Sequence, residues 1–237
     1  MNEENNSKGI ILVLVSMALF SFQDALIKFV FEKAALYEIY FGRTFIASVI
    51  LGTYLFIKKQ KIKFKTEYPF LTAIRVLLHF FAFSFFFISL TYMSLAMANA
   101  LFFSSPFFIS IFAKFFLNEQ IGIRRWSAIF LGFIGIFIVL NPDFSEFEYK
   151  NLLPVLCAFF YAISMTITKI TSDKDNLYTQ LFYFYTLAIG LCLIIFIFFG
   201  SGEFNKYNDP TMQFIFREWF SNTTYAWKYI LIMGAIA

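Results

Sequence analysis

The sequence has few of the residues on which most enzymes depend for chemistry. It contains one histidine, His79, and two cysteines, Cys157 and Cys192, which both lie inside apolar segments. A disulfide framework or a metal motif needs more cysteines or histidines at closer spacing. The sequence also has no catalytic carboxylate pair and no glycine-rich phosphate loop of the Walker type. These absences argue against an enzyme, an ATP-driven pump, and any cofactor or metal centre.

Charged residues are also scarce. They make up 14% of the chain, against 60% hydrophobic residues, and the mean hydropathy is +0.72. A soluble domain of this length cannot bury so much apolar surface, so we expect the lipid bilayer to be the solvent for part of the chain. The net charge of +4 is modest and does not indicate a nucleic-acid partner. The first apolar run, about 22 residues with no small-residue cleavage site after it, is too long for a signal-peptide core.

Long apolar runs predict membrane-spanning helices along the whole chain. A helix needs roughly 20 apolar residues to cross about 30 Å of hydrocarbon. The runs are continuous rather than alternating, which argues against strands. We therefore predict an all-α polytopic membrane protein. The predicted spans are residues 9–30, 37–57, 70–92, 95–117, 126–140, 152–171 and 178–199, followed by the first turns of another span at 229–237.

The charges of the loops predict the orientation of these spans. The second loop carries five lysines between residues 58 and 65, and the fourth carries Arg124 and Arg125. The fifth loop is acidic between residues 143 and 148. Because positive loops face the cytoplasm, we predict a multi-pass protein of the cytoplasmic (inner) membrane with a cytoplasmic N-terminus.

The chain also contains a weak internal duplication. Residues 16–40 reappear at 157–181, an offset of 141 that places Lys28 on Lys169 and Tyr37 on Tyr178. Five apolar segments separate the two starts, so the second copy enters the membrane from the opposite side. Inverted repeats of this kind are typical of secondary transporters.

A series of short motifs runs through the first half of the chain. It comprises Ala98-Asn99-Ala100-Leu101, Ser105-Pro106, Leu117-Asn118-Glu119, Arg124-Arg125-Trp126, the glycines 132 and 135, and Asn141-Pro142. In these motifs the chain resembles the EamA domain of the drug/metabolite transporter superfamily. That domain has a mid-helix proline and then Leu-x-Glu leading to a glycine-rich helix.

The resemblance implies ten helices in two inverted repeats of five, around a central cavity that carries a small metabolite. It assigns residues 1–142 to the first repeat and residues 151–237 to a partial second repeat with two helices and the start of a third. About seven to eight of the ten helices are then expected here, in a chain truncated near its C-terminus.

Several polar residues are predicted at a similar depth, toward the outer ends of their spans. Asp24 and Lys28 are four residues apart and share a helix face, with Arg43 and Asn99 on other spans. Ionisable groups within a membrane helix usually face the bundle interior. One interpretation is a substrate site in which Arg43 or Lys28 binds an anionic group. The other is an internal ion pair of Asp24 with Lys28 or Arg43, with Lys28 reaching toward the interface.

The third span carries Arg75 and His79, four residues apart. His79 titrates near physiological pH and is a candidate for substrate binding or proton coupling. The alternative for His79 is a neutral hydrogen bond between helices. Arg75 is expected near the cytoplasmic interface, as a structural anchor or a partner of phosphate headgroups. The segment from Arg75 to His79 resembles branches of the family that import metabolites.

Pro106 lies in the middle of the fourth span. It removes a backbone hydrogen bond and frees carbonyl groups near the membrane centre. Asn99, Phe103, Pro106 and Ser110 recur at helical spacing, with Ser105 beside them. We interpret this face as lining a substrate cavity, with a simple packing kink as the alternative.

Glu119 follows the fourth span, within reach of Arg124 or Arg125. A loop ion pair that fixes the turn is the simplest interpretation. A gate that opens in one state is the other.

Together these features predict a secondary transporter that moves a small metabolite by alternating access, coupled to a proton, another ion or exchange. Seven complete spans leave a seven-helix receptor or sensor as the alternative, although a receptor does not explain the duplication. Relatives in the resembling superfamily handle amino acids, nucleosides, riboflavin and S-adenosylmethionine. The sequence distinguishes neither these substrates nor a monomer from a homodimer.

Overall fold

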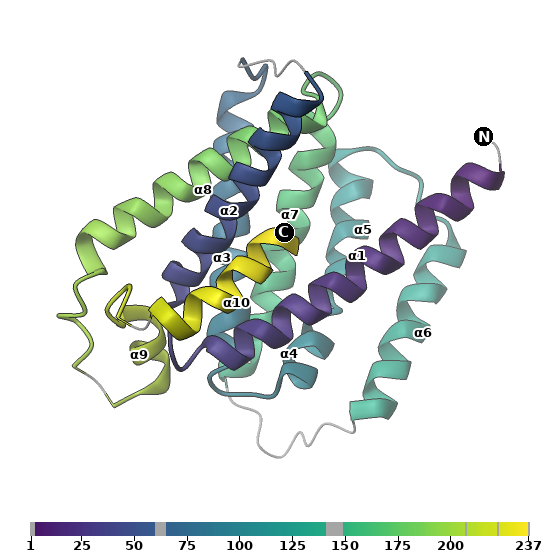
Figure 1. Ribbon diagram of the computed structural model, residues 1–237. Coiled ribbons are helices and arrows are strands. Elements are labelled where there is room, and N and C mark those ends of the chain that lie inside the picture. Colours follow the sequence, from purple (N-terminus) through teal and green to yellow (C-terminus); the bar gives the residue numbers. More distant parts are fainter. Residues whose placement is uncertain (1–2, 60–64, 141–148, 207, 222, 237) are drawn as a thin grey trace. The chain divides into compact units, whose positions relative to one another are not determined.

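The computed structural model describes residues 3–59, 65–140, 149–206, 208–221 and 223–236, and the regular structure of these residues is helical throughout (Figure 1). This confirms the predicted all-α fold class. The helices are α1 (Glu3–Val30), α2 (Leu36–Ile57), α3 (Pro69–Ser89), α4 (Leu95–Phe102), α5 (Ser105–Phe116), α6 (Ile123–Leu140), the short 3-10 helix η2 (Tyr149–Leu152), α7 (Leu153–Thr171), α8 (Leu177–Phe199), α9 (Pro210–Phe216) and α10 (Thr223–Ile236).

The predicted spans correspond closely to these helices. Within the described parts of the chain, five stretches are long and apolar enough to cross a membrane, namely Leu36–Ile57, Pro69–Ser89, Leu95–Phe116, Tyr149–Thr171 and Leu177–Phe199. The predicted first and fifth spans are the helices α1 and α6, and α10 begins six residues before the predicted 229–237 segment. Lys61, Lys63, Asn141-Pro142 and the acidic loop at 143–148 lie outside the described residues.

Prolines mark the beginnings of four helices. Pro69, Pro106, Pro154 and Pro210 all occupy the first turn of α3, α5, α7 and α9, respectively. Proline suits this position because its missing N–H has no intrahelical partner there and its fixed φ is already helical. At α9 the cap is reinforced, since the Asp209 carboxylate accepts hydrogen bonds from the Thr211 and Met212 amides at 2.9 and 3.1 Å.

The fourth span is interrupted just before its proline. It ends as α4 at Phe102 and restarts as α5 at Ser105, with Phe103 and Ser104 in a turn between them. The Phe103 and Ser104 amides donate to the carbonyls of Asn99 and Leu101 at 3.0 and 3.1 Å, which tightens the end of α4. Because Pro106 has no N–H, the Phe102 carbonyl lacks its regular intrahelical donor. The prediction of a proline irregularity in this span is confirmed, as a two-residue turn in which Phe103 and Ser104 keep helical backbone angles.

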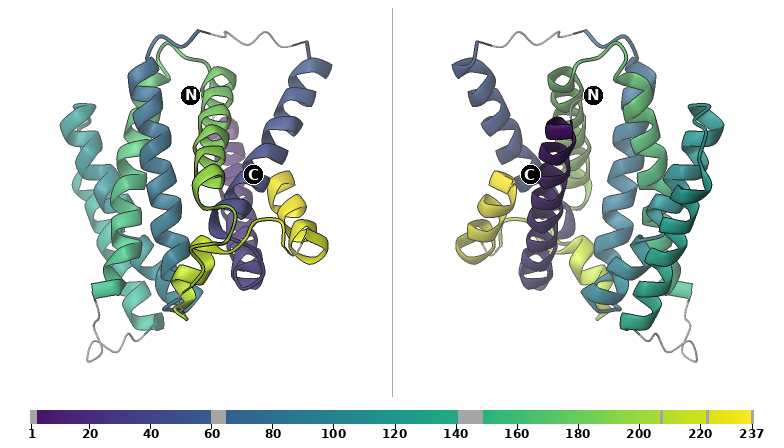
Figure 2. Two further views of the ribbon diagram at one scale, coloured as in Figure 1. Left: turned by 90° about the vertical axis from the view of Figure 1, so that its left-hand side faces the viewer. Right: turned by 90° about the vertical axis from the view of Figure 1, so that its right-hand side faces the viewer.

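The chain divides into two compact units. Unit 1 comprises Met1–Tyr54 and Cys192–Ala237, and unit 2 comprises Leu55–Leu191. In unit 1, α10 packs against α1, and the Gln23 side-chain amide donates to the Met233 carbonyl at 2.7 Å. In unit 2, α7 is the central helix and packs against α3, α4 and α5, which run beside it in Figure 2. The repeats predicted at 1–142 and 151–237 follow other boundaries and stay a prediction.

Candidate functional site

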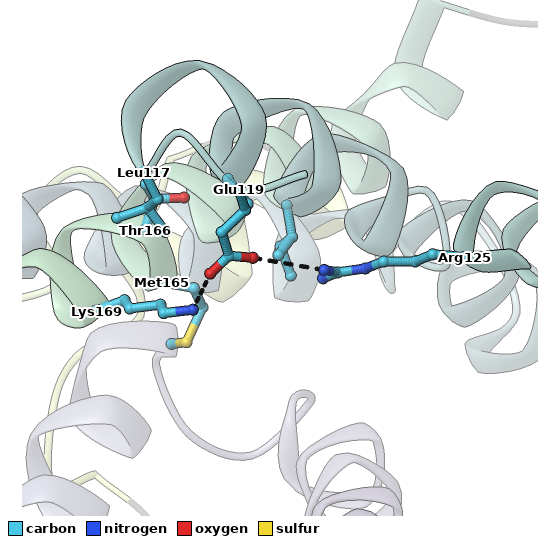
Figure 3. Close-up of a pocket in the computed structure, with 8 residues that line it drawn as sticks. Leu117, Glu119, Arg125, Met165, Thr166 and Lys169 are labelled. Carbon is cyan, nitrogen blue, oxygen red and sulfur yellow. Dashed lines mark hydrogen bonds and ion pairs between the residues drawn. The ribbon is translucent and has the colours of Figure 1, made fainter. Parts of the chain in front are cut away.

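Three charged side chains meet beyond the end of α5, and we call them the ionic cluster. Glu119, in the connection to α6, accepts a hydrogen bond from Nζ of Lys169 in α7. Its other carboxylate oxygen pairs with Nη1 of Arg125 in α6 at 3.7 Å (Figure 3). All three line a pocket of about 130 Å³. The other lining residues are Ile109, Ala113, Leu117, Met165 and Thr166.

The end of α5 positions the Glu119 carboxylate. Asn118 adopts a left-handed conformation with φ of 52°, which asparagine tolerates better than most residues. The Glu119 amide then folds back and donates to the Ala113 carbonyl at 3.2 Å. This turn points Glu119 toward Lys169, which lies in the last turn of α7. The predicted ion pair of Glu119 is confirmed with Arg125, while the Arg124 side chain is exposed.

The ionic cluster lies at the protein surface. The side chains of Lys169 and Arg125 are 60% and 49% exposed, and that of Glu119 is 32% exposed. The hydrogen bond from Lys169, and then the positive charges of Lys169 and Arg125, hold the pKa of the Glu119 carboxyl below its usual range. Ion pairs this exposed are weakly stabilising. The cluster can therefore form and open at low cost.

Lys169 is a partner that inspection of the local sequence misses, because it lies 50 residues from Glu119. The internal duplication could have drawn attention to Lys169, because it aligns Lys169 with Lys28, a candidate substrate-binding residue.

Arg75 is turned into unit 2 instead of reaching the interface. Its side chain donates from Nη1 to Oε1 of Gln180 at 2.6 Å and from Nη2 to the Gln180 carbonyl at 2.8 Å. The residue is only 4% exposed. Ser164 of α7 donates to the Arg75 carbonyl at 3.2 Å, so this position connects α3 with both α7 and α8. The contacts favour the structural interpretation of Arg75 over headgroup binding.

Asp175 is a second residue that the sequence did not mark. It is buried in the connection between α7 and α8 and accepts hydrogen bonds from the Thr66 hydroxyl and, at 3.1 Å, from the Glu67 amide. Nε2 of Gln180 donates to the Asp175 carbonyl at 3.1 Å. Asp175 thus fastens the segment before α3 to the start of α8.

His79 lies near the middle of α3, among aromatic rings. Its imidazole meets the Phe184 ring of α8 edge-on at 4.9 Å between centroids, and lies 6.1 Å from Tyr161 of α7. Tyr161 in turn contacts Phe102, the last residue of α4, at 5.4 Å. The structure therefore links the predicted residue His79 to the predicted helix break.

The four residues predicted to share a face of the fourth span have different environments. Ser110 is buried and Asn99 half-buried, whereas Pro106 is exposed and Phe103 is 54% exposed. Their role in lining a cavity stays a prediction. Ser105, at the start of α5, is buried.

The remaining predicted site residues belong to unit 1. Asp24 and Arg43 are both half-buried, and the Arg43 charge acts on the Asp24 carboxylate. Lys28 lies over the Phe31 ring at 4.7 Å, and Glu32 is an acidic neighbour. Asp24 and Arg43 therefore lie within range of each other's charge. The convergence of Asn99, a unit 2 residue, with them stays a prediction.

Unit 1 also holds a buried carboxylate that no motif in the sequence marks. Glu38, in the first turn of α2, is 2% exposed and accepts a hydrogen bond from the Trp227 indole of α10 at 3.0 Å. Nearby, Arg217 donates to the Phe31 carbonyl at 3.0 Å. Glu38 could have been found from the sequence, because it is an acidic residue at the start of an apolar span. Among the described residues, no three histidine, cysteine or acidic side chains gather as metal ligands.

The family and the three relatives described below are all named for transport. The model of the EamA-like transporter family matches residues 7–141. An S-adenosylmethionine uptake transporter of Rickettsia felis is 34% identical over 175 residues, which cover 74% of this chain and 59% of the relative. A riboflavin transporter of Vibrio cholerae is 36% identical over 96 residues, 40% of this chain and 32% of the relative. A pseudopaline exporter of Pseudomonas aeruginosa is 22% identical over 212 residues, 89% of this chain and 70% of the relative.

The chain spans about 60% of the length of the rickettsial relatives it matches. The names of the matched family and relatives describe transporters and not enzymes, in agreement with the prediction from the sequence.

Proposed function

Because the chain belongs to the EamA-like transporter family, we propose that it takes up a small metabolite across the cytoplasmic membrane by alternating access. The observation that carries this proposal is the break between α4 and α5, in the middle of an apolar span and linked to His79 through Tyr161 and Phe102. Transporters place substrate sites at broken helices near the membrane centre. The family favours this function over a seven-helix receptor.

Uptake is the favoured direction. The relatives named for S-adenosylmethionine uptake are 34% identical or close to it, whereas the relative named as an exporter is 22% identical. The lysine-rich second loop supports a cytoplasmic N-terminus. Residues 1–142 and 151–237 then form the two inverted repeats.

The ionic cluster is the proposed cytoplasmic gate. It joins α7 to the connection between α5 and α6, and so joins the two proposed repeats. Alternating access requires such a contact to form in one state and open in another. An exposed ion pair suits this role because its small net stability lets substrate binding shift the balance.

The contacts of Asp24, Arg43 and Lys28 within unit 1 fit a polar outer part of the pathway. His79 is the proposed site of proton coupling, since it is the one histidine in the sequence and lies near the middle of α3.

A ligand screen tests the proposal. The purified chain is heated in detergent with a panel of metabolites that includes S-adenosylmethionine, riboflavin, nucleosides and amino acids. A ligand that binds the folded state raises the melting temperature by mass action, by the equivalent of about 2.7 kcal/mol at one hundred times its Kd. We expect at least one metabolite to stabilise the protein. Stabilisation by none of them contradicts the proposed function.

A further inference from the structure

Within unit 2, four helices bring aromatic side chains together near the level of the helix break. His79 lies near the middle of α3 and Tyr161 near the middle of α7. Phe102 ends α4 at the break, and Phe184 lies in the first half of α8. Centroid distances of 4.9 to 6.1 Å connect the four rings in the order Phe184, His79, Tyr161, Phe102. We call them the aromatic cluster.

The aromatic cluster differs from the ordinary core of α3. Phe80, Phe83, Phe86 and Phe87 of the same helix are between 4% and 6% exposed and serve packing. All four members of the cluster are half-buried residues and keep more exposed surface than this core. Residues with remaining exposed surface can contact a ligand, whereas fully buried ones cannot.

A second aromatic surface on the same helices provides a comparison. Phe81 and Phe85 of α3 contact Phe160 of α7 at 6.2 and 5.6 Å, and all three rings lack polar atoms. The aromatic cluster instead contains an imidazole and a phenol. Polar groups within a membrane span face a protein interior or cavity rather than lipid, because their desolvation in hydrocarbon is costly. The cluster therefore has the character of a binding surface and the phenylalanine surface that of a lipid-facing one.

Arg75 helps to hold the cluster in place. Its guanidinium lies 6.0 Å from the centroid of the Phe184 ring while it donates two hydrogen bonds to Gln180. This cation–π contact positions the Phe184 ring. Preorganised rings bind a flat ligand with less loss of conformational freedom.

We propose that the aromatic cluster binds the planar nitrogen heterocycle of the cargo, with the imidazole of His79 and the hydroxyl of Tyr161 forming hydrogen bonds to ring heteroatoms. This inference rests on the proposed function and names its substrate class. The two groups of relatives are named for S-adenosylmethionine and riboflavin. The purine of one molecule and the three-ring flavin of the other are both flat heterocycles that carry a hydroxylated five-carbon group, a ribose ring in one and a ribityl chain in the other. Stacking on aromatic side chains accepts either ring, because both offer a π face.

Riboflavin fluorescence provides a direct test, since stacking on an aromatic side chain quenches it. The full chain in detergent is titrated with riboflavin, and adenosine and ribitol serve as competitors. We expect quenching by the wild type, competition by adenosine and no competition by ribitol. Tyr161→Leu should weaken binding about tenfold or more, while Tyr161→Phe, which keeps the ring but loses the hydroxyl hydrogen bond, should weaken it less. The matched control is Phe160→Leu, which removes the neighbouring ring on the other surface and should leave binding unchanged.

Phe102→Leu removes a second ring of the cluster and gives the same test if Tyr161→Leu does not stay monodisperse in size-exclusion chromatography. Equal effects of Tyr161→Leu and Phe160→Leu, or competition by ribitol as strong as that by adenosine, overturn the inference. If metabolites without a ring raise the melting temperature and heterocycles do not, the inference is overturned, whereas the proposed metabolite uptake is still supported. Absence of binding by every metabolite overturns both.

Discussion

At the scale of single residues, the clearest feature is that charged side chains have partners distant in sequence. Glu119 bonds to Lys169, and Arg75 bonds to Gln180. The Glu119–Lys169 contact is at the surface, and the Arg75–Gln180 contact is buried. The two contacts should therefore respond differently to substitution.

The stabilisation by Glu119 should depend on pH. Because Lys169 lowers the pKa of Glu119 in the folded state, its contribution is complete above the ordinary value of 4.5 and is lost as the pH falls through the lowered pKa. We expect Glu119→Gln to melt below the wild type at pH 7, and the two melting curves to converge in acid. Thermal unfolding across a pH series measures this difference.

The control is Glu67→Gln, which removes an exposed carboxylate from the connection before α3. It should have a smaller effect at pH 7 than Glu119→Gln. A difference between wild type and Glu119→Gln that persists unchanged into acid contradicts the assigned role of the Lys169 bond.

Substitution of Arg75 should be more damaging. Arg75→Ala leaves two buried acceptors of Gln180 without their donors, at a cost of about 1–3 kcal/mol for each unsatisfied group. Arg75→Lys should restore only part of the stability, because an ammonium cannot reproduce the fork of a guanidinium. Arg124→Ala, at an exposed position, is the control. Equal unfolding free energies of Arg75→Ala and Arg124→Ala would count against this account.

Sequence distance explains which contacts of these residues could be predicted. The pair of Glu119 with Arg125 is predictable because one short turn separates them. Lys169 and Gln180 reach their partners only through the packing of α7 and α8, which single-sequence patterns do not specify. Arg75 was expected at the membrane interface because its position near the start of the span suggested a charged anchor. In the structure its guanidinium is buried instead, because Gln180 provides two buried oxygen atoms that accept its hydrogen bonds.

At the scale of helices, hydrophobic runs predicted the elements well because a membrane-spanning helix is an uninterrupted apolar segment of known length. The fourth span is the informative difference. Pro106 indicated an irregularity, but the tight turn at Phe103 and Ser104 that separates α4 from α5 depends on backbone geometry.

Close packing of α10 on α2 gives a prediction at this scale. A Cβ atom at Gly234 would lie 2.5 Å from Cβ of Ile46 and 3.1 Å from the Arg43 carbonyl oxygen. Gly234→Ala should therefore destabilise the protein by about 1–3 kcal/mol through overpacking. Gly52→Ala is the matched control, since nothing lies within 4 Å of a Cβ there and alanine favours the helix. Unfolding in detergent measures both. A destabilisation by Gly52→Ala as large as that by Gly234→Ala contradicts the packing argument.

At the scale of the whole molecule, the orientation in the membrane can be tested. Cys157 and Cys192 are first replaced by alanine, and single cysteines are introduced at two exposed positions, Lys174→Cys and Glu203→Cys. Positive loops on the cytoplasmic side predict that an impermeant maleimide labels Glu203→Cys in intact cells and Lys174→Cys only after permeabilisation. The reverse pattern contradicts a cytoplasmic N-terminus.

Substrate exchange in proteoliposomes tests the central claim most directly. Vesicles containing the full chain are loaded with unlabelled S-adenosylmethionine or riboflavin and diluted into a trace of the labelled compound. Alternating access predicts that label accumulates transiently above its equilibrium level, and that Tyr161→Leu reduces this accumulation far more than Phe160→Leu. Binding of either compound without any exchange would contradict the account.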